Sequence, residues 1–388
     1  MIYYLAYFFV NATFVIVNPY LQVMLDNLGF GFKAVGVFIA CFEGFGILGP
    51  LLVGYFANKK NLYKEMVILS LIIGSVTFYL LAFANSYLSV ILLITVTGFF
   101  FRAVAPGLDY MGNLAVKGDS SKYTKIRAAG TMGYAVVSAI LSFIKKPNID
   151  SNMSIGFWFI IICLMSVFTM FFVPKQEPIV INYKKPLKED GSEDVEEKWY
   201  NKGLIIGLIV IGLSRFSLSG TYSFLSLYSI KEVGYTDLTT LNLIATLAEF
   251  FVMLYSGYLL QVKKVKPLYL LMVGSLAISV RVLIYAFLPS VKFLLLAQTL
   301  HGFCFGAFHP AAIVFINQHV RNDKVGVGIS LYYALSTGLP AVLGSTIGGV
   351  LVSNYGFKTL FIFYCIIGLV AVFTGIIFHK PLNEKIEY

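Results

Sequence analysis

Seven charged residues lie inside long apolar stretches of the chain, where a charge is costly. Four are arginines and three are carboxylates: Arg102, Arg127, Arg215, Arg281, Glu43, Asp109 and Glu249. A charge at membrane depth costs roughly 2.5 to 3.5 kcal/mol on insertion scales, so each is a candidate for a functional site. Burial raises the pKa of a carboxylate and a nearby arginine lowers it, so such pairs can exchange a proton when the arginine binds a solute. The residues therefore indicate ligand binding coupled to proton exchange, with structural ion pairs between helices as the alternative.

The composition of the chain places these charges in a membrane. Of its 388 residues, 58% are hydrophobic and only 12% are charged, whereas about 25% are charged in an average soluble protein. Met1 leads straight into an apolar run that continues past Pro19, without the basic start and small-residue cleavage site of a secretory signal. We therefore expect a polytopic membrane protein whose first apolar segment is retained.

Apolar segments long enough to cross about 30 Å of hydrocarbon recur along the whole chain. They lie at about residues 2–25, 34–57, 65–84, 88–116, 125–144, 154–173, 203–230, 239–261, 267–288, 292–318, 326–352 and 358–378. The expected fold is all-α, with twelve transmembrane helices in two pseudo-symmetric six-helix bundles. The bundles are expected at residues 1–174 and 202–388, joined by a polar cytoplasmic linker at 175–201.

Lysine and arginine residues in the connections predict the orientation of the chain. With the N terminus in the cytoplasm, 19 of these residues lie on the cytoplasmic side and 6 on the opposite side. This asymmetry predicts a multi-pass protein of the plasma or inner membrane, with both termini cytoplasmic. The net charge of +10 then follows from topology and from anionic lipid headgroups, so we expect no nucleic-acid partner.

Two short sequence matches relate the two halves. The segment GFFFRAVAP at 98–106 matches GFCFGAFHP at 302–310 in Gly, Phe, Ala and Pro, at an offset of 204 residues. A second match, at offsets of 203 to 204, pairs Gly54, Tyr55, Lys59 and Lys60 with Gly257, Tyr258, Lys263 and Lys264. The shared offset indicates a duplicated six-helix unit. In transporters built from parallel repeats, the substrate site lies near the midplane between them.

Polar residues within the spans form stripes, because helix positions three, four and seven apart share a face. Such stripes predict helices that line an aqueous cavity. The cavity-lining candidates are Asn11, Asn18, Arg215, Tyr222, Gln298 and His309. Asn11 and Asn18 have an alternative role, since amides in membrane helices often only form hydrogen bonds to neighbouring helices.

Several segments resemble a known group of transporters. AISVR at 277–281 and LLAQTLHGFCFGAFHPAA at 295–312 are similar to the 3-phenylpropionate permease family and, more distantly, to lactose permease. KYTKIRAAGTMGYAV at 122–136 resembles the arginine-bearing start of helix five in the same group, and GPLLVGYFANKK at 49–60 resembles its loop motif. The resemblance covers nearly the whole chain. It implies the major facilitator fold and proton symport.

The resemblance also implies roles for individual residues. Asp109 lies 18 residues before Arg127, the spacing of the carboxylate and arginine in the sugar site of lactose permease. Together with Arg102, these two are the expected substrate-binding residues. Glu249, Arg281 and His301 match three members of the proton-coupling cluster of that permease and are expected to form the proton switch.

The chain departs from the lactose permease pattern within this cluster. Cys304 stands where a protonatable glutamate is expected, and Gln298 stands where a lysine is expected. Glu43 lies 11 residues before Gly54, and Glu249 lies 8 residues before the matching Gly257. When the two repeats are aligned, the glutamates are therefore one helical turn apart on the same helix face. Glu43 is therefore the leading substitute for the missing carboxylate in proton coupling. Asn58 also replaces the usual aspartate of the loop motif.

These observations predict a secondary active transporter: a proton-coupled symporter that takes up a small polar or anionic organic solute by alternating access. Four arginines against three carboxylates favour an aromatic or short organic acid, and a sugar is the other substrate class. A proton-driven exporter and a non-transporting membrane receptor are the alternative functions.

No catalytic constellation is recognisable in the sequence. The four cysteines lie in apolar spans at no metal-ligand spacing, which indicates neither a disulfide nor a zinc site. We expect no enzyme activity, no metal and no cofactor. The expected partners are a small-molecule substrate, protons and the lipid bilayer, with the chain acting as a monomer.

Overall fold

The computed structural model describes residues 1–117, 119–175, 199–321 and 324–384. Helices account for nearly all of this part of the chain, and an isolated bridge pairs Tyr200 with Val320. The first half contains α1 (Ile2–Ala12), α2 (Phe14–Asp26), α3 (Phe32–Lys60), α4 (Tyr63–Leu80), η1 (Leu81–Phe83), α5 (Tyr87–Ala115), α6 (Ser120–Phe143) and α7 (Asn152–Phe171). The second contains α8 (Lys202–Tyr228), η2 (Ser229–Val233), α9 (Leu238–Gln261), α10 (Pro267–Phe287), α11 (Val291–Thr299), η3 (Gly302–Ala307), α12 (Phe308–His319), α13 (Val325–Tyr333), η5 (Ala334–Gly338), α14 (Leu339–Ile377) and η6 (Pro381–Asn383).

The helices provide twelve membrane crossings. Eleven segments of the described ranges are long and apolar enough to span a bilayer. The longest, Val325–Ile377, has 53 residues, whereas one crossing needs about 20. It is interrupted at Gly356, whose φ of 79° is a left-handed conformation that glycine adopts without strain. The two limbs on either side of Gly356 are the eleventh and twelfth spans, which confirms the expected fold.

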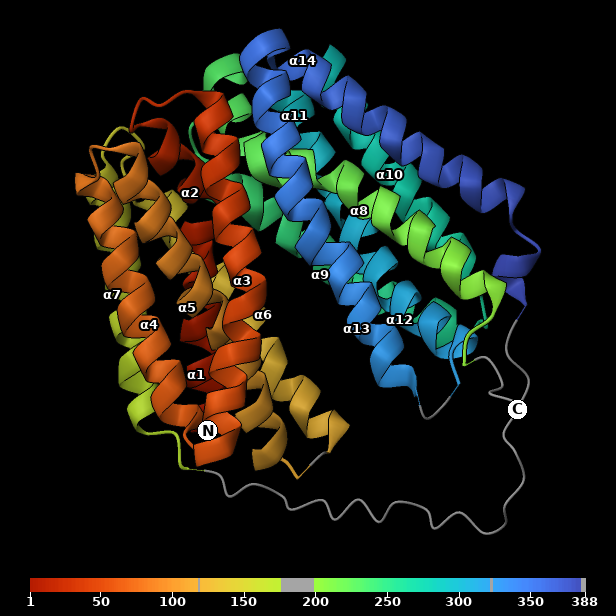
Figure 1. The fold of residues 1–388 in the computed structure, drawn as a ribbon, viewed down its shortest axis with the longest axis horizontal. Helices are drawn as coiled ribbons and strands as arrows, with labels where there is room; N and C mark the ends of the chain where they lie inside the picture. The colour runs from red at the N-terminus through yellow and green to blue at the C-terminus, as the bar shows by residue number, and fades with distance from the viewer. Residues whose placement is uncertain (118, 176–198, 322–323, 385–388) are drawn as a thin grey trace.

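The spans form two bundles, one from α1 to α7 and one from α8 to α14 (Figure 1). In this view the bundles converge at the top and diverge towards the bottom, where the N terminus lies. Within the first bundle, α5 packs against α3 and α4, and within the second, α14 packs against α8 and α10. Each half therefore has its own helix packing, as the duplicated unit in the sequence predicts.

Two glycines at the start of the matching segments make equivalent contacts in the two bundles. A Cβ at Gly98 of α5 would collide with the carbonyl oxygen of Phe42 on α3. At Gly302 of η3, a Cβ would lie 2.6 Å from the carbonyl oxygen of Ala248 on α9. Small residues at such positions let two helix backbones approach closely inside a membrane. The structure thus relates α3 and α5 to α9 and the tenth span by their packing as well as their sequence.

The bundles touch backbone to backbone at the end away from the N terminus. Gly36, near the start of α3, faces α14 so closely that an added Cβ would collide with the carbonyl oxygen of Ser345. The same Cβ would lie 2.9 Å from the Cα of Gly349. Glycine is needed at this crossing because any side chain would separate the two bundles.

Polar contacts between the bundles lie at the same end. Lys231 Nζ of η2 is 2.6 Å from Asp26 Oδ2 at the end of α2. The Ser142 hydroxyl at the end of α6 donates a hydrogen bond of 2.7 Å to Asp237, which precedes α9. One end of the molecule is thus closed by an ion pair, a hydrogen bond and a close helix crossing.

Candidate functional site

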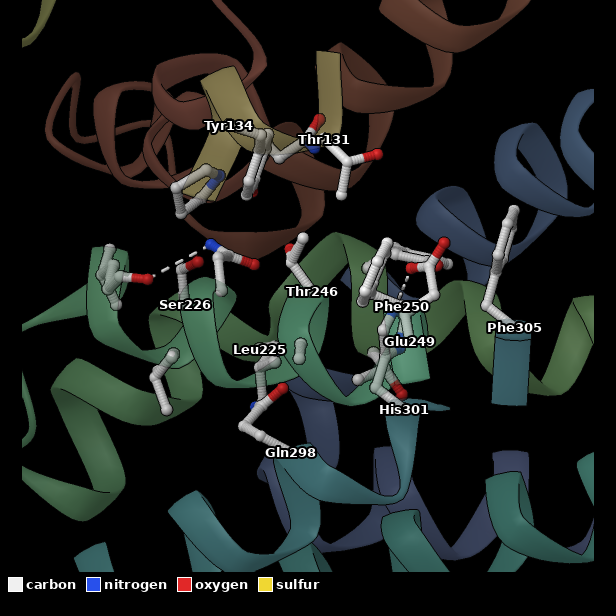
Figure 2. Close-up of a pocket in the computed structure, with 18 of the residues that line it drawn as sticks. Thr131, Tyr134, Leu225, Ser226, Thr246, Glu249, Phe250, Gln298, His301 and Phe305 are labelled. Carbon is white, nitrogen blue, oxygen red and sulfur yellow. Dashed lines mark hydrogen bonds and ion pairs between the residues drawn. The ribbon is translucent and has the colours of Figure 1, made fainter. Parts of the chain in front are cut away.

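A cavity of about 330 Å³ lies between the two bundles, within the range of about 300 to 1,000 Å³ typical of small-molecule sites. Its lining includes five neutral amides and four aromatic rings: Asn11, Asn18, Gln22, Asn242, Gln298, Tyr134, Tyr222, Phe250 and Phe305. Figure 2 shows Thr131 and Tyr134 of α6 facing Thr246 and Glu249 of α9 across this cavity. Polar side chains from both bundles therefore surround one space.

The structure brings about half of the candidate residues to this cavity. Those that line it are Asn11, Asn18, Tyr222, Gln298, Glu249, Arg281 and His301. Those outside the lining are Asp109, Arg127, Arg102, Glu43, Arg215 and His309. The expected proton-coupling residues of the second half thus lie at the cavity wall, apart from the expected substrate-binding residues of the first half.

His301 links a carboxylate to an arginine at the cavity wall. Its Nε2 lies 3.4 Å from Glu249 Oε2, and its Nδ1 lies 3.0 Å from Arg281 Nη1. Glu249 lies on α9, Arg281 on α10, and His301 on the tenth span, Val291–His319, which comprises α11, η3 and α12. Figure 2 shows the contact between Glu249 and His301 as a dashed line. The helices thus place one titratable ring between an acid and a permanent cation.

The geometry defines the protonation state of His301. A guanidinium group has only donors, so Arg281 must donate to the Nδ1 lone pair of the ring. The remaining proton of a neutral imidazole is then on Nε2, the nitrogen that faces Glu249. A second proton could bind at Nδ1 only if Arg281 withdrew its donor. His301 is therefore neutral in this arrangement.

Two neutral residues complete the shell around Arg281. Its Nη2 donates to Gln298 Oε1 at 2.8 Å and its Nε donates to the Tyr285 hydroxyl at 2.9 Å. Gln298 also donates to that hydroxyl through Nε2, at 3.1 Å. Sequence reasoning missed Tyr285, although it lies four residues after Arg281 on the same helix face. A lysine at position 298 would place a second cation against Arg281 and repel it. Gln298 instead provides a hydrogen-bond acceptor for the arginine.

Asp109 and Arg127 lie near each other but outside the cavity lining. Arg127 Nη2 is 3.9 Å from Asp109 Oδ2, and the Tyr7 hydroxyl donates to Asp109 Oδ1 at 2.9 Å. Gly112 leaves room for this tyrosine, since a Cβ there would lie 2.5 Å from its hydroxyl oxygen. Tyr7 is one turn from Asn11 along α1, so the pair lies one helical turn from the cavity, towards the N-terminal end of the molecule.

Glu43 and Arg102 form a direct ion pair between α3 and α5. The guanidinium also lies over the Phe42 ring, 5.0 Å from its centroid, and Gly46 leaves the space that the arginine side chain occupies. Arg102, expected beside Asp109 and Arg127, is thus bound to Glu43 instead. The structure likewise places Glu43 with this arginine rather than with His301.

Arg215 and His309 lie behind the cavity wall in the second bundle. Arg215 is 4% exposed, and its guanidinium lies over the rings of Phe305 and Phe308, at 4.9 and 4.3 Å. The Nδ1 of His309 is 2.5 Å from the Tyr332 hydroxyl. The His309 ring also stacks on Phe305, with centroids 5.3 Å apart. The stripe from Gln298 to His309 therefore follows one face but reaches past the cavity.

The cysteine that replaces the expected glutamate is fully buried. Cys304 packs with Leu218, Ala277 and Ile278, and its thiol also lies near the guanidinium of Arg281. Among the residues that the structure describes, no group of three His, Cys, Asp or Glu side chains could hold a metal ion.

Two helical bundles that enclose a polar cavity in the membrane define the class of the protein as a transporter fold rather than an enzyme. Residues 1–363 match the model of the MFS_1 like family, and the chain belongs to that family. No curated protein matches the chain by sequence.

Solved structures with this fold cover nearly the whole chain. The nucleoside transporter NupG is similar over 98% of both chains, with a TM-score of 0.80 and 17% identity. A POT family transporter in complex with a thioalcohol-conjugated peptide matches over 99% of this chain and 96% of its own, with a TM-score of 0.75 and 11% identity. A bacterial homolog of the human lysosomal transporter Spinster, in an inward-facing and unoccupied conformation, covers 98% of this chain and 95% of its own, with a TM-score of 0.65 and 13% identity. At these identities the similarity establishes the fold.

Proposed function

We propose that the chain is a proton-coupled symporter that takes up a small polar or anionic organic solute by alternating access. The observation that supports this most directly is the polar cavity between the bundles, with Glu249, His301 and Arg281 joined at its wall. A solute in the cavity would contact both bundles at once. Its binding could therefore be coupled to the proton and to the relative position of the halves.

The proposed orientation has both termini and the linker at 175–201 in the cytoplasm, where 19 of the lysines and arginines would lie. The end closed by Gly36, Asp26 and Asp237 is then the outer end. In this orientation the structure is an inward-facing state. We further propose that the units are residues 1–174 and 202–388 and that the chain acts as a monomer in the plasma or inner membrane.

The proposed proton carrier of the second half is Glu249. Uptake of a proton by this carboxylate removes its attraction for the Nε2 proton of His301, and the ring can then turn away from Arg281. Arg281 would thereby gain a free donor that faces the cavity. Proton binding at Glu249 and solute binding at Arg281 are thus linked through one imidazole. Glu43, paired with Arg102, is proposed as a second acid in coupling.

Asp109 and Arg127 are proposed to contact the solute on its path through the first bundle. Their ion pair is long, at 3.9 Å, and the arginine side chain is 64% exposed. A loose and exposed pair can rearrange around a ligand at little cost, because exposed ion pairs contribute only about 0 to 1 kcal/mol. Arg102 is bound to Glu43. It could contact a solute on this path only if that ion pair opened.

The substrate class is open between organic acids and hydroxyl-rich solutes. The amides and rings of the cavity can bind sugars or nucleosides, and the fold similarity to a nucleoside transporter adds nucleosides to the compounds to test. The deciding experiment uses proteoliposomes with an imposed pH gradient and radiolabelled acids, sugars and nucleosides. Gradient-dependent accumulation of one class supports symport. Net efflux would indicate an exporter, and binding without flux would indicate a receptor.

A further inference from the structure

Arg215 is exceptional among the seven charges that lie within the spans. Glu43 pairs with Arg102, Asp109 lies near Arg127, and Arg281 reaches Glu249 through His301. No described carboxylate forms an ion pair with Arg215. The spans of the second bundle thus hold two buried arginines, whereas Glu249 is half-buried at the cavity wall. Arg215 therefore has no counter-ion among the described residues.

The free donors of Arg215 lie along one edge of its guanidinium. Its Nη1 donates to the carbonyl oxygen of Cys304, at 3.3 Å, in the π-helical turn η3. Nε and Nη2 are buried and have no partner at normal hydrogen-bond geometry among the described residues, although the Tyr332 hydroxyl lies close to this guanidinium. These two nitrogens carry the parallel N–H groups that bind both oxygens of a carboxylate. A buried donor without a partner is costly, so a pair of them on one edge indicates a ligand.

Two aromatic rings pack against the guanidinium of Arg215, and one of them also lines the cavity. Phe308, which is fully buried, lies against the guanidinium at 4.3 Å. Phe305 also contacts the guanidinium, at 4.9 Å, and it lines the cavity. Figure 2 shows Phe305 at the edge of the cavity, beyond Glu249 and His301. A rotation of this ring would open Arg215 to a solute, and π-helical turns such as η3 are frequent at functional sites.

We propose that Arg215 is the binding site for a carboxylate group of the transported solute, which makes the substrate an organic acid. The carboxylate accepts two hydrogen bonds from Nε and Nη2, and the remainder of the solute occupies the cavity beside Phe305. The negative charge of the solute neutralises the unpaired charge of the second bundle. This inference rests on the proposed transport function and narrows its substrate class. A carboxylate of the chain itself, brought to Arg215 in another conformation, is the competing explanation that the experiment separates.

The experiment measures binding by calorimetry, with the purified full chain in nanodiscs at constant ionic strength. The probes are benzoate and 3-phenylpropionate, each compared with its uncharged amide. The variants are Arg215→Gln, which removes the charge, and Arg215→Lys, which keeps the charge without the paired donors. Lys292→Gln is the matched control, because it removes one exposed positive charge outside this site.

We expect at least one acid to bind the wild-type chain and the control, and its amide to bind more weakly. In both Arg215 variants the acid should bind about 10- to 100-fold more weakly, as for loss of hydrogen bonds to a charged group. Equal binding of acid and amide by the wild-type chain would overturn the proposal, and this comparison does not depend on the variants folding. Unchanged acid binding in Arg215→Gln, or no binding of either acid, would overturn it too.

The binding result and the transport result can fail separately. If sugars or nucleosides accumulate with the pH gradient and no acid binds, the carboxylate site is wrong and symport stands. If acids bind through Arg215 and nothing accumulates, the site stands and symport is wrong. If Arg215→Gln stops the transport of uncharged solutes and leaves acid binding unchanged, the arginine pairs with a carboxylate of the chain.

Discussion

The Nε2 of His301 lies 3.4 Å from Glu249 Oε2, while the opposite ring nitrogen accepts a hydrogen bond from Arg281. This relationship has a counterpart in the first bundle, where Glu43 of α3 pairs with Arg102 of α5. In each half a glutamate of the second span of the repeat meets a basic group of the fourth span. The duplication therefore extends to these two half-buried acids, although the basic partner differs.

The first prediction concerns the proton. Glutamine at position 249 keeps the size of the side chain and can still accept from His301, but it cannot bind a proton. Glu249→Gln should therefore lose at least about tenfold of its gradient-driven accumulation, a loss that corresponds to about 1.4 kcal/mol. Exchange of labelled for unlabelled substrate without a gradient should continue. Accumulation equal to that of the wild-type chain would show that the proton binds elsewhere.

A second prediction concerns the path through the first bundle. Asp109→Ala and Arg127→Ala should each abolish uptake, because either change leaves the opposite charge without its partner at the site where we propose that the solute passes. Tyr7→Phe is the graded control: it removes one hydrogen bond of 2.9 Å to Asp109 and keeps the ring. Its uptake should fall less than that of the two alanine variants. Normal transport by either alanine variant would show that the pair does not contact the substrate.

Helix periodicity explains why part of this arrangement could be predicted from the sequence. Residues such as His301 and Phe305 share a face because they are four positions apart on one helix. The hydrophobic spans and the repeat offset are local signals of the same kind, and they predicted the twelve crossings. Gly356 marks the turn between the last two crossings. There the structure has two helical limbs joined by a single residue with a positive φ.

Pairings between helices could not be predicted in this way. Glu43 and Arg102 are 59 residues apart in the sequence, and they meet because Gly49 and Gly98 let α3 and α5 approach closely. The symmetry argument that linked Glu43 to the second bundle gave no partner for it. Arg215 likewise looked like other cavity residues in the sequence. Only the packing of Phe305 and Phe308 against it shows that it lies behind the cavity wall.

A third prediction separates a structural role of Glu43 from a role in coupling. Glu43→Gln leaves Arg102 without its counter-ion, so the melting temperature should fall, and the double variant with Arg102→Gln should recover part of the loss. We expect a coupling energy of about 0.5 to 3 kcal/mol, as for residues in direct contact. Transport is then measured on the same variants. Glu43→Gln should accumulate less substrate with a pH gradient; full accumulation would leave the pair a purely structural role.

The fourth prediction tests the closed end of the molecule. Valine at Gly36 would collide with α14, so Gly36→Val should separate the bundles at this end. A cysteine placed at Asn242 in the cavity, in a chain without its native cysteines, should then react faster with an impermeant maleimide added from that side. Gly54→Val is the matched control on α3, because a Cβ there has no described atom within 4 Å. Equal labelling rates in the two variants would contradict the role assigned to this helix crossing.

The last prediction concerns the pH dependence of the same closed end. Asp237 lies outside the spans, and its partial burial alone would raise the pKa of the carboxyl. Hydrogen bonds from Thr240, Ser142 and Thr239 outweigh that effect and hold the pKa below its ordinary value of 3.8. The ionised form therefore stabilises the contact with Ser142 at every pH above that value. This stabilisation is lost only as the pH falls through the lowered pKa.

The closed end should consequently be insensitive to pH between 8 and 5. Lys145 and Lys292 are exposed positions, one in each half. The distance distribution between spin labels at these two positions, measured by double electron–electron resonance, should be the same across that pH range. Asp237→Ala should broaden it at every pH, since it removes both the bond to Ser142 and the N-terminal cap of α9, which is typically worth about 0.5 to 2 kcal/mol. A distance change between pH 8 and 5 in the wild-type chain, retained in Asp237→Ala, would assign the transition to a different titratable group, with Glu249 and His301 as the first to test.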